Sequence, residues 1–351
     1  MSIHSARAKF WLFSFLFAFV ALAPGLAAAD GLRRAFDRIV VFGDSLSDPG
    51  NAFALNGGQT ISPPDYGMSG VTNGIPDVIS LVPDAPYSSR RFSNGRTWIE
   101  DLAAAVGLPQ NARPAVAGAL FGEDDGRASN YAVGGATAAD IGASQFPLGR
   151  QVDLFLSDVG GRAPADALYV VEIGGNDVRA ALVAGPGVLN LALTSVAQNI
   201  QKLYGAGARH FLVWSAPDVG RTPALQRLNT FAAPGIAAGA TALSAGYNQN
   251  LQGVLQGLRA ALPGITIVPF DAFGLLADVQ ANPRRFGLID ATTACIEPNV
   301  PQFGFPSSPP FRCAQQDRFF FWDGIHPTRA GHAIIAIEVG KTLIGAVLQD
   351  L

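Results

Sequence analysis

The sequence contains few residues of several types, and each shortage excludes a class of function. Among 351 residues there are only two cysteines, two methionines and four histidines. Charged residues make up 15% of the chain, and the formal net charge is −3 without any basic block. Proteins that bind nucleic acid carry clustered positive charge, so a nucleic-acid partner is not expected. The His-Glu-x-x-His motif of zinc enzymes is absent, and no Gly-x-Gly-x-x-Gly opens a helix at "GGND".

Long hydrophobic runs are also missing, except at the N-terminus. The apolar stretch Phe10–Leu22 follows Arg7 and Lys9, and small residues at 27–29 follow it. This is the pattern of a secretory signal peptide, and the run is short for a membrane anchor, which needs about 20 apolar residues. We therefore expect residues 1–29 to be a cleaved signal peptide and the protein to be secreted or periplasmic. No later stretch is apolar enough for a transmembrane segment.

The remaining residues, 30–351, show no low-complexity linker and no internal repeat, so we expect one domain. Loss of Arg7 and Lys9 with the signal peptide leaves 22 basic against 27 acidic residues, a net charge of 22 − 27 = −5. Cys295 and Cys313 enclose a proline-rich stretch. Because export implies an oxidising compartment, we expect them to form a disulfide, with two free thiols as the alternative.

Short apolar runs alternate with stretches of helical spacing, which predicts a parallel sheet covered by helices on both faces. A segment rich in glycine, proline, asparagine and serine, residues 56–93, predicts an irregular insertion at one rim of the site. The predicted strands are Ile39–Phe42, Asn130–Val133, Leu168–Ile173, Phe211–Trp214 and Ile265–Phe270. The predicted helices are Thr97–Val106, Leu189–Tyr204, Ala242–Leu262 and Arg329–Gln349.

The first predicted strand stops abruptly at "GDSLSD", and Ser45 stands at that point. A serine at the carboxyl end of a buried strand lies where open α/β sheets place their active sites. The stretch alone is equally compatible with Asp44 or Ser45 acting only as a helix N-cap. Position 47 is serine, so the Gly-x-Ser-x-Gly elbow of α/β-hydrolases does not describe this turn.

Histidine is scarce enough to narrow the choice of a catalytic base. His210 enters a predicted strand and His332 lies in a predicted helix, so a structural role is expected for each. His326 stands on the loop before the last helix, three residues after Asp323. A carboxylate at this spacing can accept a hydrogen bond from Nδ1 and leave Nε2 free as a base. The alternative is a loop in which Asp323 only caps the helix.

Two further predicted strands end in paired glycines, at residues 134–135 and 174–175, and Asn176 follows the second pair. Backbone amides at such glycines, and an asparagine side chain, can stabilise an oxyanion, although tight packing at a turn is the alternative for each. Since parallel strands present their carboxyl ends at one edge, we expect these donors to converge with Ser45 and His326. Together they are the parts that acyl transfer requires.

Through these stretches the chain resembles the GDSL esterases and lipases of the SGNH hydrolase superfamily. The stretches "FGDSLSDPGN", "NYAVGGATA", "VVEIGGND" and "FWDGIHPT" correspond to four family blocks in family order, over residues 42–328. The resemblance implies an α/β fold, a flavodoxin-like three-layer α/β/α sandwich with a five-stranded parallel sheet in the order 2-1-3-4-5. It implies hydrolysis of a small-molecule or lipid carboxylic ester with no cofactor and no metal, and no obligate protein partner is evident.

The resemblance also implies a role for each matching residue. Ser45 corresponds to the nucleophile, and Asp323 and His326 to the acid and base of the triad. The backbone amides of Ser45 and Gly135 and the side chain of Asn176 correspond to the oxyanion hole, with Gly134 as the other candidate.

The substrate is less determined by the sequence. We expect short to medium acyl chains, for which the aromatic run 319–322 offers apolar surface, although at least two of its side chains are expected to lie in the core. An acetyl-esterase acting on polysaccharide, and a non-catalytic exported binding protein with the same fold, are the alternatives.

Overall fold

The computed structural model describes residues 32, 35–61, 82–116, 118, 126–142, 144, 146–231, 233–296 and 312–347. The expected signal peptide, residues 1–29, lies outside the described residues, as do residues 62–81 of the predicted insertion. The strands are β1 (Arg38–Gly43), β2 (Thr60–Ile61), β3 (Val82–Pro83), β4 (Ala167–Glu172), β5 (His210–Trp214), β6 (Thr266–Phe270), β7 (Asp290–Ala294) and β8 (Phe319–Phe321). The helices are α2 (Asn51–Leu55), α4 (Trp98–Ala105), α6 (Leu148–Asp158), α7 (Gly175–Ala184), α8 (Gly187–Ala206), α9 (Pro223–Phe231), α10 (Ile236–Ala261), α11 (Ala272–Ala281) and α12 (Arg329–Val347).

A parallel sheet with the order β1-β4-β5-β6 forms the centre of the molecule. Its strands are short runs of β-branched and aromatic residues, and all six residues of β4 are buried. A strand covered on both faces needs such a continuous apolar sequence, because neither face is in contact with water.

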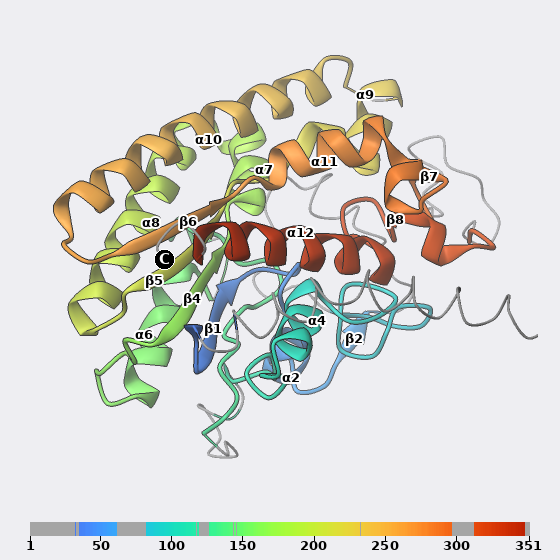
Figure 1. Ribbon diagram of the computed structural model, residues 1–351. Coiled ribbons are helices and arrows are strands. Elements are labelled where there is room, and N and C mark those ends of the chain that lie inside the picture. Colours follow the sequence, from blue (N-terminus) through green and yellow to red (C-terminus); the bar gives the residue numbers. More distant parts are fainter. Residues whose placement is uncertain are drawn as a thin grey trace, which may run out of the picture.

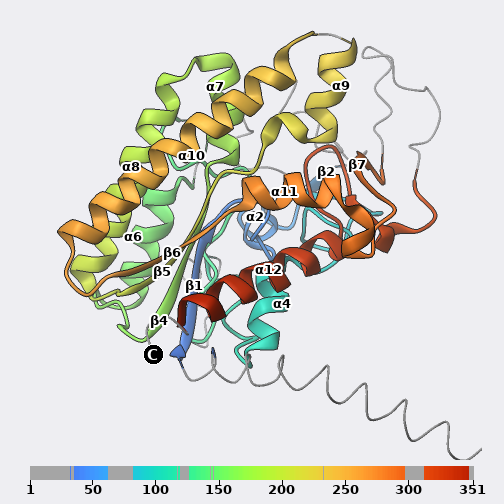
Figure 2. The ribbon, with the colours of Figure 1, turned by 45° about the horizontal axis from the view of Figure 1, so that its top comes forward.

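Two layers of helices cover the sheet, and alternate strand residues contact them (Figures 1 and 2). Phe42 and Tyr169 pack in a core cluster with residues of α6, α8 and α10. Val41 and Val170 pack in the opposite cluster with residues of α4, α11 and α12. Because successive side chains of a strand point to opposite faces, one strand serves both clusters. This arrangement confirms the predicted three-layer α/β/α fold.

The sheet differs from the expectation at one edge, since it has four strands rather than five in the part of the chain described here. The predicted strand Asn130–Val133 runs beside β1, but only one bridge joins them, between Val41 and Asn130. Backbone hydrogen bonds from Tyr131 to Val41 (2.7 Å) and from Val133 to Gly43 (3.1 Å) continue the contact. The segment therefore takes the outer position of the order 2-1-3-4-5 without forming a regular ladder.

Asparagine side chains bond the backbone of this segment on the side that faces away from β1. The Asn51 Nδ2 donates to the carbonyl oxygens of Asn130 and Ala132, each at 2.8 Å, and its Oδ1 accepts the Val116 amide at 3.0 Å. Asn130 donates in turn to the Ser47 carbonyl at 2.8 Å. Since Asn51 and Asn130 are fully buried, these bonds satisfy backbone groups that water does not reach.

Helix predictions succeeded where the apolar spacing was regular. The helices α4, α8 and α12 begin within two residues of the predicted positions. Helix α10 begins at Ile236 rather than at residue 242, because the small residues before 242 pack closely. A Cβ added at Gly220 would lie only 2.1 Å from the Ala237 carbonyl. Helices α2, α6, α7, α9 and α11 were not predicted.

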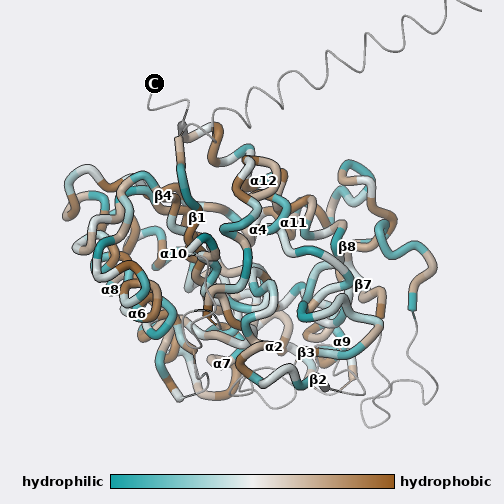
Figure 3. Tube along the Cα trace, turned by 90° about the horizontal axis from the view of Figure 1, so that it is seen from below, coloured by the Kyte–Doolittle hydropathy of each residue, from teal (hydrophilic) through white to brown (hydrophobic). Residues whose placement is uncertain are grey.

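Hydrophobic and hydrophilic stretches alternate along α6 and α8, as Figure 3 shows, which is typical of helices that cover one face of a sheet. Among the described helices, none combines the length and the apolar character needed to cross a membrane.

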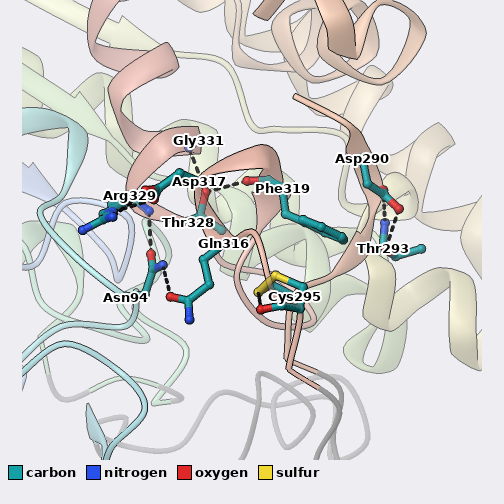
Figure 4. Close-up of a disulfide and its surroundings, with 11 residues drawn as sticks. Asn94, Asp290, Thr293, Cys295, Gln316, Asp317, Phe319, Thr328, Arg329 and Gly331 are labelled. Carbon is teal, nitrogen blue, oxygen red and sulfur yellow. Dashed lines mark hydrogen bonds and ion pairs between the residues drawn. A yellow bond between two sulfur atoms is a disulfide. The ribbon is translucent and has the colours of Figure 1, made fainter. Parts of the chain in front are cut away.

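Cys295 and Cys313 form the predicted disulfide, which Figure 4 shows with its surroundings. The backbone amide of Cys295 donates to Phe321, and that of Ile296 donates to Trp322, at 3.0 and 2.7 Å. Residues 297–311, most of the loop that the bridge closes, lie outside the described residues. The bridged segment is thus bonded to the residues directly before Asp323.

Substitution of Asn51 tests the side-chain bonding of the sheet edge. We expect Asn51→Ala to lower the free energy of unfolding by about 2–4 kcal/mol, because the Ala132 carbonyl and the Val116 amide lose their buried partner and the Asn130 carbonyl keeps only the Ala115 amide. Urea unfolding followed by circular dichroism measures the change. The control Asn282→Ala removes an exposed asparagine at the end of α11 and should cost less than about 0.5 kcal/mol. Equal effects of the two substitutions would contradict the interpretation.

Candidate active site

Close packing at the strand ends forces the sharp turns that carry the predicted site residues. A Cβ at Gly43, the last residue of β1, would lie 2.6 Å from the Glu172 carbonyl oxygen, so only glycine fits before the turn that holds Ser45. Gly174, after β4, has a φ of 122° and faces the Tyr247 ring, which would be 2.9 Å from an added Cβ. The chain then enters α7, and Asn176 lies in its first turn.

Ser45, His326 and Asp323 form a chain of hydrogen bonds. The Ser45 Oγ lies 2.9 Å from His326 Nε2, and His326 Nδ1 lies 2.7 Å from Asp323 Oδ2. The imidazole is 7% exposed and the carboxylate is fully buried. Asp323 Oδ1 accepts the backbone amides of Ile325 (2.8 Å) and His326 (2.6 Å), which orients the carboxylate. The structure therefore brings together the three residues that the sequence indicates for a triad.

The Asp323 carboxyl stays ionised in spite of its burial. Burial alone would raise its pKa, but the facing His326 and the hydrogen bonds from the imidazole and the backbone hold the pKa of Asp323 below its ordinary value of 3.8. An ionised carboxylate accepts the Nδ1 hydrogen and so leaves Nε2 as the acceptor facing Ser45.

The two glycines that the sequence leaves open as oxyanion donors differ in their partners. The Gly134 amide donates to Asp48 Oδ2 at 2.9 Å. A Cβ at this position would also lie 2.4 Å from the Phe92 ring. Within the described residues, no hydrogen bond engages the amides of Gly135 or Ser45. Gly135 has a φ of 79°, a backbone conformation that favours glycine. The geometry therefore favours Gly135 over Gly134.

Three groups fix the Asn176 amide. Its Nδ2 donates to the Ala136 carbonyl at 2.9 Å and to Asp44 Oδ2 at 3.2 Å, and its Oδ1 accepts from Arg179 Nη1 at 2.9 Å. Since arginine can only donate, this contact sets which end of the amide is the NH₂ group. No motif in the sequence marks Arg179, because it stands one helical turn after Asn176 in an ordinary helix.

Two buried aspartates hold the loop that follows Val133. Asp48 accepts the amides of Gly50 and Asn51 through Oδ1, and those of Ala52 and Gly134 through Oδ2. Asp177 accepts the amides of Ala138 and Ala139 at 2.8 and 2.9 Å. Asp48 follows β1 and Asp177 follows β4, so the two carboxylates connect the loop to two strand ends and fix its position.

A second carboxyl group lies beside Asp44 in the interior. The Glu172 Oε2 accepts the Ser47 hydroxyl at 2.9 Å and faces the Asp44 amide at 3.4 Å. Burial, and next the charge of Asp44, raise the pKa of Glu172 well above its ordinary value of 4.5. Burial also raises the pKa of Asp44 to about 6, against the opposing effects of the Leu46 amide, His326 and Arg179. A single glutamate in the apolar run "LYVVEIGG" is a signal from which a buried carboxyl could have been predicted.

Two adjoining pockets open at this edge of the sheet. The first, about 390 Å³, is lined by Ser45, Asn176, Arg179 and His326 among others. The second, about 460 Å³, is almost entirely apolar, and its walls include residues of β8, α11 and α12. The two share Leu46, Pro217, Thr222 and Ile325.

The two other described histidines lie away from Ser45. His210 begins β5 and packs edge-on against Phe36. His332 accepts the Trp98 amide at the start of α4 through Nδ1, and burial, followed by the nearby His326, lowers the pKa of His332 to about 3. No group of three or more His, Cys, Asp or Glu residues that could hold a metal ion occurs in the described part of the chain.

Comparison with known proteins gives consistent matches over most of the chain. The family model described as GDSL-like Lipase/Acylhydrolase matches residues 39–339. Similar curated proteins include GDSL esterase/lipase At5g55050 of Arabidopsis thaliana, which is 30% identical over 93% of this chain and 89% of its own length. GDSL esterase/lipase At1g06990 of the same plant is 26% identical over 87% of this chain and 88% of its own.

Replacement of Glu172 tests whether this buried carboxyl is protonated. The fold raises its pKa, so the folded state binds the proton more tightly than the unfolded state. The resulting stability is complete below pH 4.5 and is lost as the pH rises through the folded-state pKa. We expect the free energy of unfolding of Glu172→Gln to fall less steeply between pH 5 and 9 than that of the parent, measured by urea unfolding at each pH.

The control is Glu338→Gln, which removes a carboxylate that pairs with Lys341 on α12. It should leave the pH dependence of the parent unchanged. If the free energy of unfolding depends on pH equally in the parent and in Glu172→Gln, Glu172 is not the group that causes the dependence.

Proposed function

The chain belongs to the GDSL-like lipase/acylhydrolase family, and on that premise we propose that it hydrolyses carboxylic esters through an acyl-enzyme on Ser45. The hydrogen-bonded chain from Ser45 through His326 to Asp323 is the observation that carries the proposal. We further propose that residues 30–351 form one exported catalytic domain. The disulfide between Cys295 and Cys313 supports export, because such bonds persist in oxidising compartments.

In the proposed reaction, His326 Nε2 takes the Ser45 proton while Oγ attacks the ester carbonyl. The ionised Asp323 stabilises the imidazolium that forms and keeps it oriented. His326 then protonates the leaving alcohol, and water enters by the same route to release the acid. The proposed steps need only groups of the chain, the ester and one water molecule.

The oxyanion is proposed to bind the amides of Ser45 and Gly135 and the side chain of Asn176. One N–H of Asn176 is held by the Ala136 carbonyl at 2.9 Å. The other makes the longer 3.2 Å contact with Asp44, and we expect this N–H to bind the oxyanion in the orientation in which Ala136 and Arg179 hold the amide. Donors that are oriented in advance stabilise the tetrahedral intermediate without reorganisation at the moment of reaction.

We propose that the apolar pocket next to Leu46 and Ile325 receives the acyl chain. Phe320 and Phe321 contribute to its wall, and both are at most 4% exposed. An apolar pocket favours alkyl groups by about 0.8 kcal/mol for each methylene it buries. This supports short to medium acyl chains, rather than the acetyl group of a polysaccharide esterase.

Substitution of the proposed nucleophile and of an oxyanion donor tests the reaction. With p-nitrophenyl esters from acetate to palmitate, we expect Ser45→Ala to lose activity by about 10⁴-fold or more and Asn176→Ala to lose about 10²–10³-fold in kcat. Asn282→Ala, outside the site, should retain the parent activity. Equal turnover by the parent and Ser45→Ala would exclude Ser45 as the nucleophile. A parent with no activity on any ester would favour the non-catalytic binding protein.

A larger side chain in the apolar pocket tests the assignment of the acyl chain. We expect Leu275→Trp, on α11, to lower kcat/KM for the octanoate ester about tenfold and to leave that for acetate unchanged, because the indole fills space that longer chains need. Leu191→Trp, at a position 54% exposed on α8, is the control. An equal loss on acetate and octanoate would place the acyl chain elsewhere.

A further inference from the structure

One loop contacts both the proposed base and its carboxylate. We call residues 84–97, between β3 and α4, the Tyr87 loop. The Tyr87 hydroxyl donates to Asp323 Oδ2 at 2.8 Å, although 236 positions separate the two residues. The Phe92 ring stacks on the His326 ring, with centroids 5.4 Å apart and 29° between planes. The Ser93 hydroxyl donates to the Pro327 carbonyl at 2.8 Å.

Tyr87 is held rigidly where it meets the carboxylate. The side chain is 6% exposed, and its ring packs edge-on against Trp322, which is fully buried and directly precedes Asp323. A phenol fixed in this way cannot turn to water. Its hydrogen bond to an ionised carboxylate is of the charge-assisted kind, which is shorter and stronger than a bond between neutral groups.

We propose that Tyr87 is a positioning residue, whose hydroxyl shares Asp323 Oδ2 with the His326 imidazole and thereby sets how strongly the carboxylate holds the protonated base. This proposal rests on the proposed function of the triad. The phenol and the Nδ1–H compete for one oxygen atom, at 2.8 and 2.7 Å. While the phenol donates, part of the carboxylate charge is engaged, and the imidazolium releases its proton more readily.

Other titratable groups lie near the base. Among the described residues, Asp44, on the turn after β1, and His332, on α12, also interact electrostatically with His326. Within the Tyr87 loop, Arg91 is paired with Glu100 of α4 at 2.6 Å, so its charge is compensated. Removal of the Tyr87 hydroxyl changes none of these groups.

The test is Tyr87→Phe, which removes the hydroxyl and keeps the ring that packs on Trp322. We expect the His326 ring to titrate about 0.5–1 pH unit higher than in the parent, by NMR, with its signals assigned by their loss in His326→Gln. The acid limb of kcat/KM for a p-nitrophenyl ester should move by the same amount, a loss of about threefold to tenfold at pH 6 with KM unchanged.

Tyr169→Phe is the matched control, since it removes a phenol that donates at 2.7 Å to the Pro164 carbonyl, in β4 and away from the triad. In Tyr169→Phe, the NMR titration of His326 and the pH dependence of kcat/KM should match those of the parent. An unshifted ring titration in Tyr87→Phe, or an equal shift in the control, would overturn the proposal. The NMR titration needs no substrate, so it decides the role of Tyr87 even if Ser45→Ala proves as active as the parent and the proposed function fails.

Discussion

Backbone amides at the carboxyl edge of the sheet have no strand partner, and buried carboxylates take up most of them. Asp48 accepts four amides, including that of Gly134, and Asp177 accepts two from the same loop. Asp323 accepts two more beside His326. Since a buried amide without a partner is costly, these bonds fix the course of each loop. Within the described residues no hydrogen bond engages the amides of Ser45 and Gly135, which are the amides that we propose for the oxyanion.

Much of the fold was predictable because it depends on local pattern. Strands β4 and β5 are apolar except at Glu172 and His210, since helices cover both faces, and α4 and α8 follow regular helical spacing. The sheet edge was not predictable in the same way. Residues 130–133 have the composition of a strand, but Asn51 and Asn130 bond the backbone through side chains, and composition does not reveal such bonds. Helix α7 was missed because its first turn reads as a glycine turn.

The residues of the site also fall into two groups, those that the sequence indicated and those that only the structure revealed. Ser45, Asn176 and His326 stand in short motifs, so their types and spacing indicated chemistry before their contacts were known. Tyr87 and Arg179 stand in no motif, and their importance lies in contacts that only the tertiary structure creates. Tyr87 meets Asp323 across 236 positions, from a segment that the sequence marks only as irregular. Residues that position a reactive side chain are often recognised only in the structure. They act through their location in three dimensions, and a sequence motif does not record that location.

The separation of Ser45 from His326 by 281 positions has a consequence for the life of the chain. The nucleophile is synthesised early and its base is synthesised late. A nascent or still unfolded polypeptide carries a serine no more reactive than any other, since nothing nearby can take its proton. Hydrolysis therefore begins only after α12 and the segment before it have docked onto the sheet. Together with the export that we propose, this order of assembly would protect the esters of the cell that produces the protein.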